Sequence, residues 1–429
     1  MSNKKVLIIT YYWPPSGGAG VQRWLKFVKY LPQLGWEPIV YTAENGEYPV
    51  LDHQLIKEIP ENIEVIKTPI WEPYSWYKKL SGRKQNDNIN SGFLSENKKK
   101  SKLIESISVW VRGNLFIPDA RKFWIKPSVK FLSNYLKENK VDAIISSGPP
   151  HSMHLIALAL KKKFNIPWIA DFRDPWTNID YYQDLKLSKR SDQKHKRLEK
   201  NVLLNTDIAL SVGKTLAKEL QALGSNKVEV IENGYDPEDF NLKESTLDKK
   251  FTIAHIGSFT PSRNHPILWE SIKELIKENK EFADHLQLKL IGKIDYSVKE
   301  SIEENGLSEY VKFLAYLPHN QVIKEQTSSH ILLLMVNNTP NAKGIVTGKV
   351  FEYMASSRPI LVIGPKDGDL AQIINESNTG IVCNYDEKQK LKSTLLDLFY
   401  KKIKLETTIE KYSRPQLTQK LSKLLNDII

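Results

Sequence analysis

Short apolar segments alternate along the chain with stretches in which apolar residues recur every three or four positions. The first apolar segment is residues 6–10. The positions after it that follow helical spacing are Val21, Trp24, Leu25, Val28 and Leu31, and Gly35 ends the pattern. Further strands are predicted at residues 38–42, 141–147, 166–171, 207–212 and 228–234. Strands that alternate with helices predict an α/β fold with a parallel sheet.

A second series of the same kind begins at residue 251. Its strands are predicted at residues 251–257, 286–291, 311–317, 331–336, 359–363 and 380–383. The polar residues 236–250 separate the two series and are typical of an interdomain linker. We therefore predict two Rossmann-like, doubly wound domains, residues 1–235 and 251–405. Because ligands of such sheets bind beyond the carboxyl ends of the strands, we expect the domains to face each other across a binding cleft.

The composition of the 429 residues is that of a globular protein, with 41% apolar and 26% charged residues, which excludes disordered, collagen-like and coiled-coil classes. Its one cysteine, Cys383, permits no intrachain disulfide and disfavours a cysteine-based zinc site. The longest apolar run, residues 331–336, is far shorter than the ~20 residues that span a bilayer. The N-terminal apolar run stops at Ile9, too early for a signal peptide, so we expect a cytoplasmic location.

The net charge of +12 is concentrated in one segment. Residues 78–102 contain eight basic and two acidic residues and few apolar ones. One interpretation is a solvated, lysine-rich loop, and the alternative is a patch for an anionic membrane surface. Leu103, Ile107, Trp110 and Val111 follow it at helical spacing, as in a helix that rests on a membrane or packs on a core. No nucleic-acid recognition motif accompanies the charge, so we expect no nucleic-acid partner.

A glycine-rich loop follows the first strand. Gly17 and Gly18 permit close approach of a ligand to the backbone, and the helix after them presents free N–H groups. The loop is not a dinucleotide-binding fingerprint, because Arg23 stands where its last glycine would be. A structural turn and a ligand loop both remain open interpretations.

Two polar motifs lie at the carboxyl ends of predicted strands in the first half. Residues 146–152 include His151 and Ser152, and Arg173 and Asp174 follow the strand that ends at Asp171. One interpretation is a structural ion pair between Asp171 and Arg173, because buried charges require partners. The other assigns His151, Arg173 and Asp174 to substrate orientation or acid–base chemistry.

The second half places cations in comparable positions. Gly257 and Ser258 follow the first strand of the second domain, and Arg263 lies before a helix predicted at residues 267–277, well placed to hold a phosphate. Residues 344–349 resemble a phosphate loop, but their glycine spacing is one residue short. Val350 also replaces the required Ser or Thr, so we reject a Walker A motif.

A helix predicted to start near Thr347 and Gly348 carries Lys349 and Glu352 one turn apart. In one interpretation Lys349 holds a diphosphate while Glu352 accepts hydrogen bonds from a ribose diol, at about 1.5–3 kcal/mol each. In the other, the two residues form an ordinary i,i+3 surface ion pair.

We expect no metal site. Asp367 and Asp369 match the spacing of a metal-binding DxD motif, but Asp369 is better explained as the N-cap of the following helix. His195 and His319 are isolated in the sequence and are expected to be exposed.

Taken together, these motifs resemble glycosyltransferase family 4, whose members have the GT-B fold. The resemblance rests on PPSGGAG at residues 14–20, VIENGYD at 230–236, Gly257 with Arg263, KVFEYMA at 349–355 and RPI at 358–360. FIPDA at 116–120, SGPPHS at 147–152 and WIADFRDPW at 168–176 are similar to a bacterial subgroup that builds surface polysaccharides.

The resemblance implies a retaining, metal-independent transfer of a sugar from a UDP- or GDP-sugar to a lipid-linked or polysaccharide acceptor, with no permanently bound cofactor. It implies that residues 1–235 lie on the acceptor side and residues 251–405 bind the nucleotide sugar. A helix at 416–429, within a C-terminal segment of residues 406–429, would cross back to the first domain. Association with the inner face of the membrane is a further expectation.

The resemblance also assigns roles to individual residues. The donor-binding set is Gly17, Gly18, Gly257, Ser258, Arg263, Thr347, Gly348, Lys349 and Glu352. Arg263 and Lys349 neutralise the leaving diphosphate, Arg173 and Asp174 face the donor sugar, and His151 and Ser152 lie on the acceptor side.

One position departs from the family pattern. The family commonly has a glutamate eight positions before Glu352, where this chain has Gly344, so the donor sugar is not predicted. The alternatives are a nucleotide-sugar epimerase of the same fold and a non-catalytic, membrane-associated assembly factor.

Overall fold

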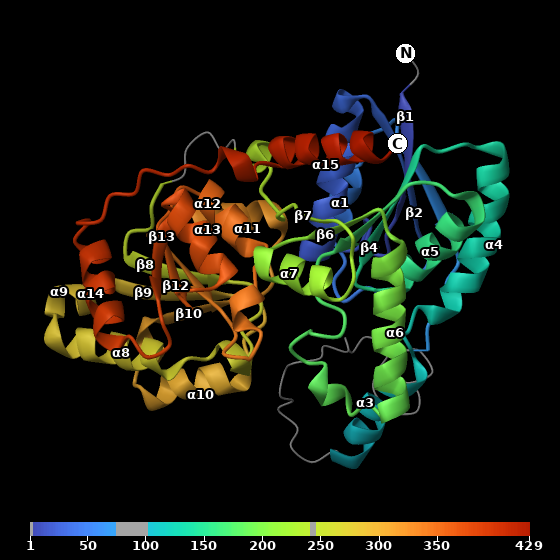
Figure 1. The fold of residues 1–429 in the computed structure, drawn as a ribbon. Coiled ribbons are helices and arrows are strands. Elements are labelled where there is room, and N and C mark those ends of the chain that lie inside the picture. Colours follow the sequence, from blue (N-terminus) through green and yellow to red (C-terminus); the bar gives the residue numbers. More distant parts are fainter. Residues whose placement is uncertain (1–2, 74–101, 241–245) are drawn as a thin grey trace. The chain divides into compact units, whose positions relative to one another are not determined.

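The computed structural model describes residues 3–73, 102–240 and 246–429, which form two compact units. Unit 1 comprises the described residues up to Asn233 together with Arg414–Ile429, and unit 2 comprises those of Gly234–Ser413 (Figure 1). The described residues 236–240 and 246–250 belong to unit 2, where Asp248 forms an ion pair with Lys289 at 2.7 Å. The basic residues 78–101 lie outside the described residues.

Unit 1 contains a parallel sheet with the strand order β3-β2-β1-β4-β5-β6-β7. Its strands are β1 (Lys4–Ile9), β2 (Trp36–Ala43), β3 (Glu64–Thr68), β4 (Ala143–Gly148), β5 (Trp168–Phe172), β6 (Ile208–Ser211) and β7 (Val228–Val230). Its helices are α1 (Ala19–Tyr30), α3 (Lys102–Leu115), α4 (Lys122–Glu138), α5 (Ser152–Phe164), α6 (Lys189–Asn205), α7 (Lys214–Ala222) and α15 (Arg414–Ile428).

The helices of unit 1 cover both faces of this sheet. Leu7 and Ile9 of β1 belong to one buried cluster, and Val6 and Ile8 belong to another on the opposite face. Since both faces are buried, the strand reads as a continuous apolar run rather than an alternating one. The second cluster also contains side chains of α1 and α15, which lie side by side in Figure 1. The C-terminal helix is therefore part of the core of unit 1.

Unit 2 contains a parallel sheet with the order β10-β9-β8-β11-β12-β13. Its strands are β8 (Phe251–Ile256), β9 (Leu286–Ile291), β10 (Val311–Leu314), β11 (Ile331–Met335), β12 (Ile360–Ile363) and β13 (Gly380–Cys383). Its helices are α8 (Pro266–Glu278), α9 (Lys280–His285), α10 (Tyr296–Glu304), α11 (His319–Ser328), α12 (Lys349–Ala355), α13 (Asp369–Ser377) and α14 (Lys388–Phe399). The prediction of two doubly wound α/β domains is confirmed.

One strand was not predicted from the sequence. β3 lies at the edge of the sheet of unit 1 and pairs with β2 alone. Its residues are half-buried or exposed, and its two adjacent apolar residues are flanked by Glu64 and Lys67. An edge strand with one solvated side gives a weaker apolar signal than a central parallel strand.

No helix in the described parts of the chain is long and apolar enough to cross a membrane. α3 contains all four positions of the predicted amphipathic helix, and its Trp110 side chain is 45% exposed.

Candidate functional site

In unit 2, the turn after β8 is the centre of the candidate site. Gly257 has a φ of +109°, a backbone conformation that favours glycine. A Cβ at this position would lie 2.6 Å from the Lys349 Nζ atom, so any larger residue would collide with the lysine. The Lys349 side chain therefore lies directly against this turn, at the carboxyl end of β8.

Arg263 reaches the same turn from the 3₁₀ helix Pro261–Arg263. Its NH1 group donates to the Ser258 carbonyl at 3.1 Å, and its Nε donates to Asn337 Oδ1 at 2.7 Å. Asn337 comes two residues after β11, the neighbour of β8 in the sheet. The structure thus brings Arg263 and Lys349 together, as the predicted diphosphate site requires.

The two cations affect each other's ionisation. Burial, and next the nearby Arg263 guanidinium, lower the pKa of Lys349 to about 7, while the Glu352 carboxylate acts in the opposite direction. Lys349 is therefore only partly protonated at neutral pH. An anionic ligand at this turn would favour the charged ammonium and offset the repulsion between the two cations.

Glu352 projects from the first turn of α12, which begins at Lys349 with Gly348 as its N-cap. The amide of Gln326 in α11 donates to Glu352 Oε2 at 3.2 Å. The ion pairs of the described residues do not include one between Lys349 and Glu352, so the surface ion-pair interpretation is wrong. Thr347 and Gly348 are half-buried and their carbonyls accept the first backbone hydrogen bonds of the turn.

Gly344, at the position where the family commonly has a glutamate, ends the 3₁₀ helix Ala342–Gly344. Its backbone N–H donates to the Asn341 carbonyl at 3.0 Å. It contributes no side chain to the site.

In unit 1, the buried carboxylate at the end of β5 belongs to a polar network. Asp171 accepts hydrogen bonds from Arg23 at 2.9 and 3.1 Å, and both side chains are fully buried. Trp24 Nε1 donates to the same carboxylate at 2.9 Å, and Ser147 Oγ does so at 3.0 Å. The interpretation in which Asp171 pairs with Arg173 is therefore wrong. The partner of Asp171 is Arg23, the residue that stands where a dinucleotide-binding fingerprint would have its last glycine. This ion pair holds α1 against the sheet.

Arg173 joins two loops at the carboxyl edge of the same sheet. Its NH1 group donates to the Gly20 carbonyl at 2.9 Å, and its NH2 group donates to the Pro149 carbonyl. A Cβ at Gly20 would lie 2.9 Å from Arg173 NH1, so the glycine makes this close approach feasible. The neighbouring Asp174 side chain is exposed. Arg173 thus holds the loops in place, and Asp174 is the more accessible of the two residues.

The two predicted loop glycines have different surroundings. The Gly17 N–H donates to the Val50 carbonyl at 2.8 Å, and a Cβ there would lie 3.2 Å from Asp52 Cβ. Gly18, the N-cap of α1, has a φ of +88°, and no described atom lies within 4 Å of the place of a Cβ. Gly17 therefore packs against its own unit, whereas Gly18 faces open space.

The predicted acceptor-side residues are both buried. The His151 ring stacks on Trp176 with centroids 4.6 Å apart, and burial holds its pKa well below the usual value, so it is neutral. Ser152 Oγ donates to Asp119 Oδ1 at 2.9 Å, and its N–H donates to Oδ2 at 2.9 Å. Ser152 thus anchors the start of α5.

Three other sequence expectations need correction. His195 is not exposed: it is buried and accepts a hydrogen bond from Trp176 Nε1 at 3.1 Å. His319 is half-buried and lies 3.4 Å from Asp239. Asp369 is the first residue of α13, whose N-cap is Gly368. In the part of the chain that the structure describes, no group of three His, Cys, Asp or Glu residues is arranged to hold a metal ion.

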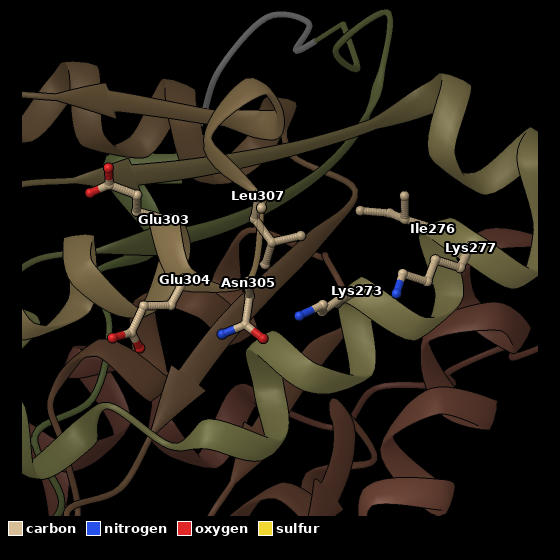
Figure 2. A pocket seen from close by; sticks show the side chains of 8 residues that line it. Lys273, Ile276, Lys277, Glu303, Glu304, Asn305 and Leu307 are labelled. Atoms are coloured by element: carbon tan, nitrogen blue, oxygen red, sulfur yellow. The ribbon is translucent and has the colours of Figure 1, made fainter.

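A shallow pocket in unit 2 lies apart from this cluster (Figure 2). It is lined by Lys273, Ile276 and Lys277 of α8 and by Glu303, Glu304, Asn305, Gly306 and Leu307 around the end of α10. Both helices run back from the carboxyl edge of a parallel sheet, so their ends lie at its amino edge. Ligands of doubly wound sheets bind at the opposite edge.

Comparison with known proteins identifies two regions of the chain. The family model described as Glycosyltransferase Family 4 matches residues 93–239, and the one described as Glycosyl transferases group 1 matches residues 250–400. A search of curated proteins gave no significant match.

Solved structures share the fold over nearly the whole chain. A mutant of TarM from Staphylococcus aureus, solved with fondaparinux, alpha-GlcNAc-glycerol and UDP, is 13% identical with a TM-score of 0.62, covering 99% of this chain and 100% of that one. WaaG, a glycosyltransferase involved in lipopolysaccharide biosynthesis, is 13% identical with a TM-score of 0.54, covering 98% and 95%. A protein from Listeria monocytogenes, proposed to be a UDP-N-acetylglucosamine 2-epimerase, is 12% identical with a TM-score of 0.55, covering 98% and 95%.

The two family models together span well over half of the chain, and each falls largely on one of the two α/β units. The chain therefore belongs to the glycosyltransferases, with a family 4 region followed by a group 1 region in a GT-B fold.

Proposed function

We propose that this protein is a retaining glycosyltransferase that transfers a sugar from a nucleotide-diphosphate sugar to a lipid-linked or polysaccharide acceptor of a cell-surface glycan. The observation that carries the proposal is the convergence of Arg263 and Lys349 on the Gly257–Ser258 turn. Two cations at one backbone turn, with no carboxylate of the described residues bonded to Lys349, form an attractive site for a diphosphate.

The chemistry follows from the charge that develops when the bond between sugar and diphosphate breaks. The leaving diphosphate gains negative charge, and fixed cations lower the energy of that state more than that of the bound donor. In this proposal Arg263 and Lys349 supply the stabilisation, and Glu352 orients the donor by accepting hydrogen bonds from its ribose. Because Asn337 and the Ser258 carbonyl already fix the Arg263 guanidinium, little reorganisation is needed during the reaction.

The nature of the acceptor is supported by the relatives. WaaG takes part in lipopolysaccharide biosynthesis, and the TarM structure contains UDP together with a sugar–glycerol compound. By this analogy the acceptor is a surface glycan or its lipid-linked precursor. Association with the inner face of the membrane belongs to the same proposal.

One exposed surface near α4 supports membrane association. Trp71 is 60% and Phe123 41% exposed, and their rings are in edge contact with centroids 4.9 Å apart. Lys122 Nζ lies 5.0 Å from the Phe123 ring centroid. Exposed aromatic rings beside a lysine are typical of proteins that contact lipid headgroups.

The direct test is calorimetric titration of the full chain with UDP, GDP and ADP. Binding of one of them by the wild-type protein, together with its loss in a double variant Arg263→Ala/Lys349→Ala, supports the proposal. Equal binding by both proteins would remove the two cations from the mechanism. A lack of binding to all three nucleotides would favour the non-catalytic assembly factor.

A nucleotide-sugar epimerase is the second candidate, supported by the structural likeness to the Listeria protein. Both matching family models are glycosyltransferase models, which favours the transferase. Incubation with donor alone separates the two candidates, because an epimerase converts the donor without any acceptor.

A further inference from the structure

Gln326 is a buried amide beside the proposed ribose-binding carboxylate. It lies in α11 and is only 1% exposed. Its Nε2 donates to Glu352 Oε2 at 3.2 Å, whereas its buried Oε1 finds no hydrogen-bond partner among the described residues. A buried carbonyl oxygen without a donor is unfavourable, so such groups are rare in folded proteins and each requires an explanation.

We propose that Gln326 is a positioning residue that fixes the carboxylate of Glu352 for recognition of the nucleotide ribose. This inference rests on the proposed function of Glu352. The contact from the Gln326 amide holds one carboxylate oxygen of Glu352, Oε2, in a fixed direction. With Oε2 held in this way, the rotation of the carboxylate is restricted and Oε1 is left for the ligand.

A second contact supports the same arrangement of the two helices. Arg358, which follows α12, donates from Nε to the carbonyl of Thr327, the neighbour of Gln326 in α11, at 2.8 Å. α11 is therefore joined to α12 at Glu352 and to the chain just after the end of α12 at Arg358. This backbone contact fixes the helix spacing independently of the amide, so a change at Gln326 should alter the carboxylate more than the fold.

The chain contains a matched control. Gln372 donates to Glu376 Oε1 at 2.8 Å within α13, and both side chains are exposed. This pair has the same amide-to-carboxylate hydrogen bond at a shorter distance, and its carboxylate also pairs with Lys411 at 2.9 Å. Gln372→Leu should therefore leave nucleotide binding unchanged.

The test measures the affinities of UDP and 2′,3′-dideoxy-UDP by calorimetry, or of the GDP pair if the wild-type protein binds GDP. The two hydroxyl groups should raise the affinity of the wild-type protein and of Gln372→Leu at least tenfold. The ratio of the affinity for UDP to that for 2′,3′-dideoxy-UDP should fall below threefold in Gln326→Leu and to about one in Glu352→Ala.

The outcomes separate the two proposals. A ratio that falls in Glu352→Ala but stays at the wild-type level in Gln326→Leu would overturn this inference and leave the proposed function intact. An equal loss of affinity for both nucleotides in Gln326→Leu, with the ratio retained, would show a structural role only. A wild-type protein that does not distinguish the two nucleotides would overturn the ribose-binding role of Glu352 and this inference with it.

Discussion

Arg23 and Asp171 lie 148 positions apart and form a bidentate ion pair in which neither side chain is exposed. Arg23→Met should destabilise unit 1 by about 3–5 kcal/mol, because it leaves a buried carboxylate without its cation. The measurement is chemical denaturation followed by tryptophan fluorescence. The control is Lys196→Met, which removes a solvent-accessible pair with Asp192 and should cost less than about 1 kcal/mol. Equal losses of unfolding free energy in the two variants would show that the buried pair contributes no more to stability than an exposed one.

Gly257→Ala should weaken nucleotide binding at least tenfold. The new methyl group would stand 2.6 Å from Lys349 Nζ, in a backbone conformation that disfavours side chains, so lysine and turn must move apart. Gly306→Ala is the control: it also has a positive φ, of +69°, but no described atom lies within 4 Å of the new methyl group. Calorimetry should find normal nucleotide affinity in that variant. Unchanged affinity in Gly257→Ala would mean that the position of Lys349 against this turn does not matter for nucleotide binding.

Nucleotide affinity should decrease as pH rises above 7. The pKa of Lys349 is lowered to about 7 in the unliganded protein, and a bound diphosphate would raise it by favouring the charged form. Binding therefore takes up a proton above pH 7, and affinity should fall by up to about tenfold per pH unit between pH 7 and 9. In Lys349→Arg the guanidinium stays charged throughout this range, so the nucleotide affinity of that variant should not change with pH. A flat profile in the wild-type protein would contradict the assignment.

Glu352→Ala should lower turnover at limiting donor at least tenfold, since one lost charge-assisted hydrogen bond is worth about 1.5–3 kcal/mol. The measurement is kcat/KM for the donor. Glu376→Ala, at an exposed carboxylate on α13, should keep wild-type kcat/KM. Full activity in Glu352→Ala would exclude it from the mechanism.

Replacement of both Trp71 and Phe123 by Ser should reduce binding to vesicles that contain an anionic phospholipid. Both rings are exposed, so their loss should cost little stability while it removes apolar area that can enter the headgroup region. Phe313→Ser, an equally exposed aromatic position in unit 2, should bind vesicles normally in co-sedimentation. If the double variant sediments like the wild-type protein, this surface is not the membrane contact.

The strands of both sheets were largely predictable because parallel strands buried on both faces are continuous apolar runs. β3 was not, because its outer side is solvated. Arg263 and Lys349 could be picked out from the sequence as candidate diphosphate ligands, because Arg263 follows a strand and Lys349 begins a helix. Gln326 and Asn337 were not, because amides are common in surface helices and loops, and their partners lie 26 and 74 positions away. The partner of Asp171 was missed for the same reason: distance along the sequence hides contacts across a sheet.

The assignment of α15 to unit 1 has a consequence for biosynthesis. Leu417, Leu421 and Leu425 belong to the same buried cluster as Trp24 and Val28 of α1. A ribosome makes these leucines after every residue of unit 2, so the first unit to be translated is the last to complete its core. Until then the apolar face of α1 that these leucines cover remains open to solvent in the newborn chain.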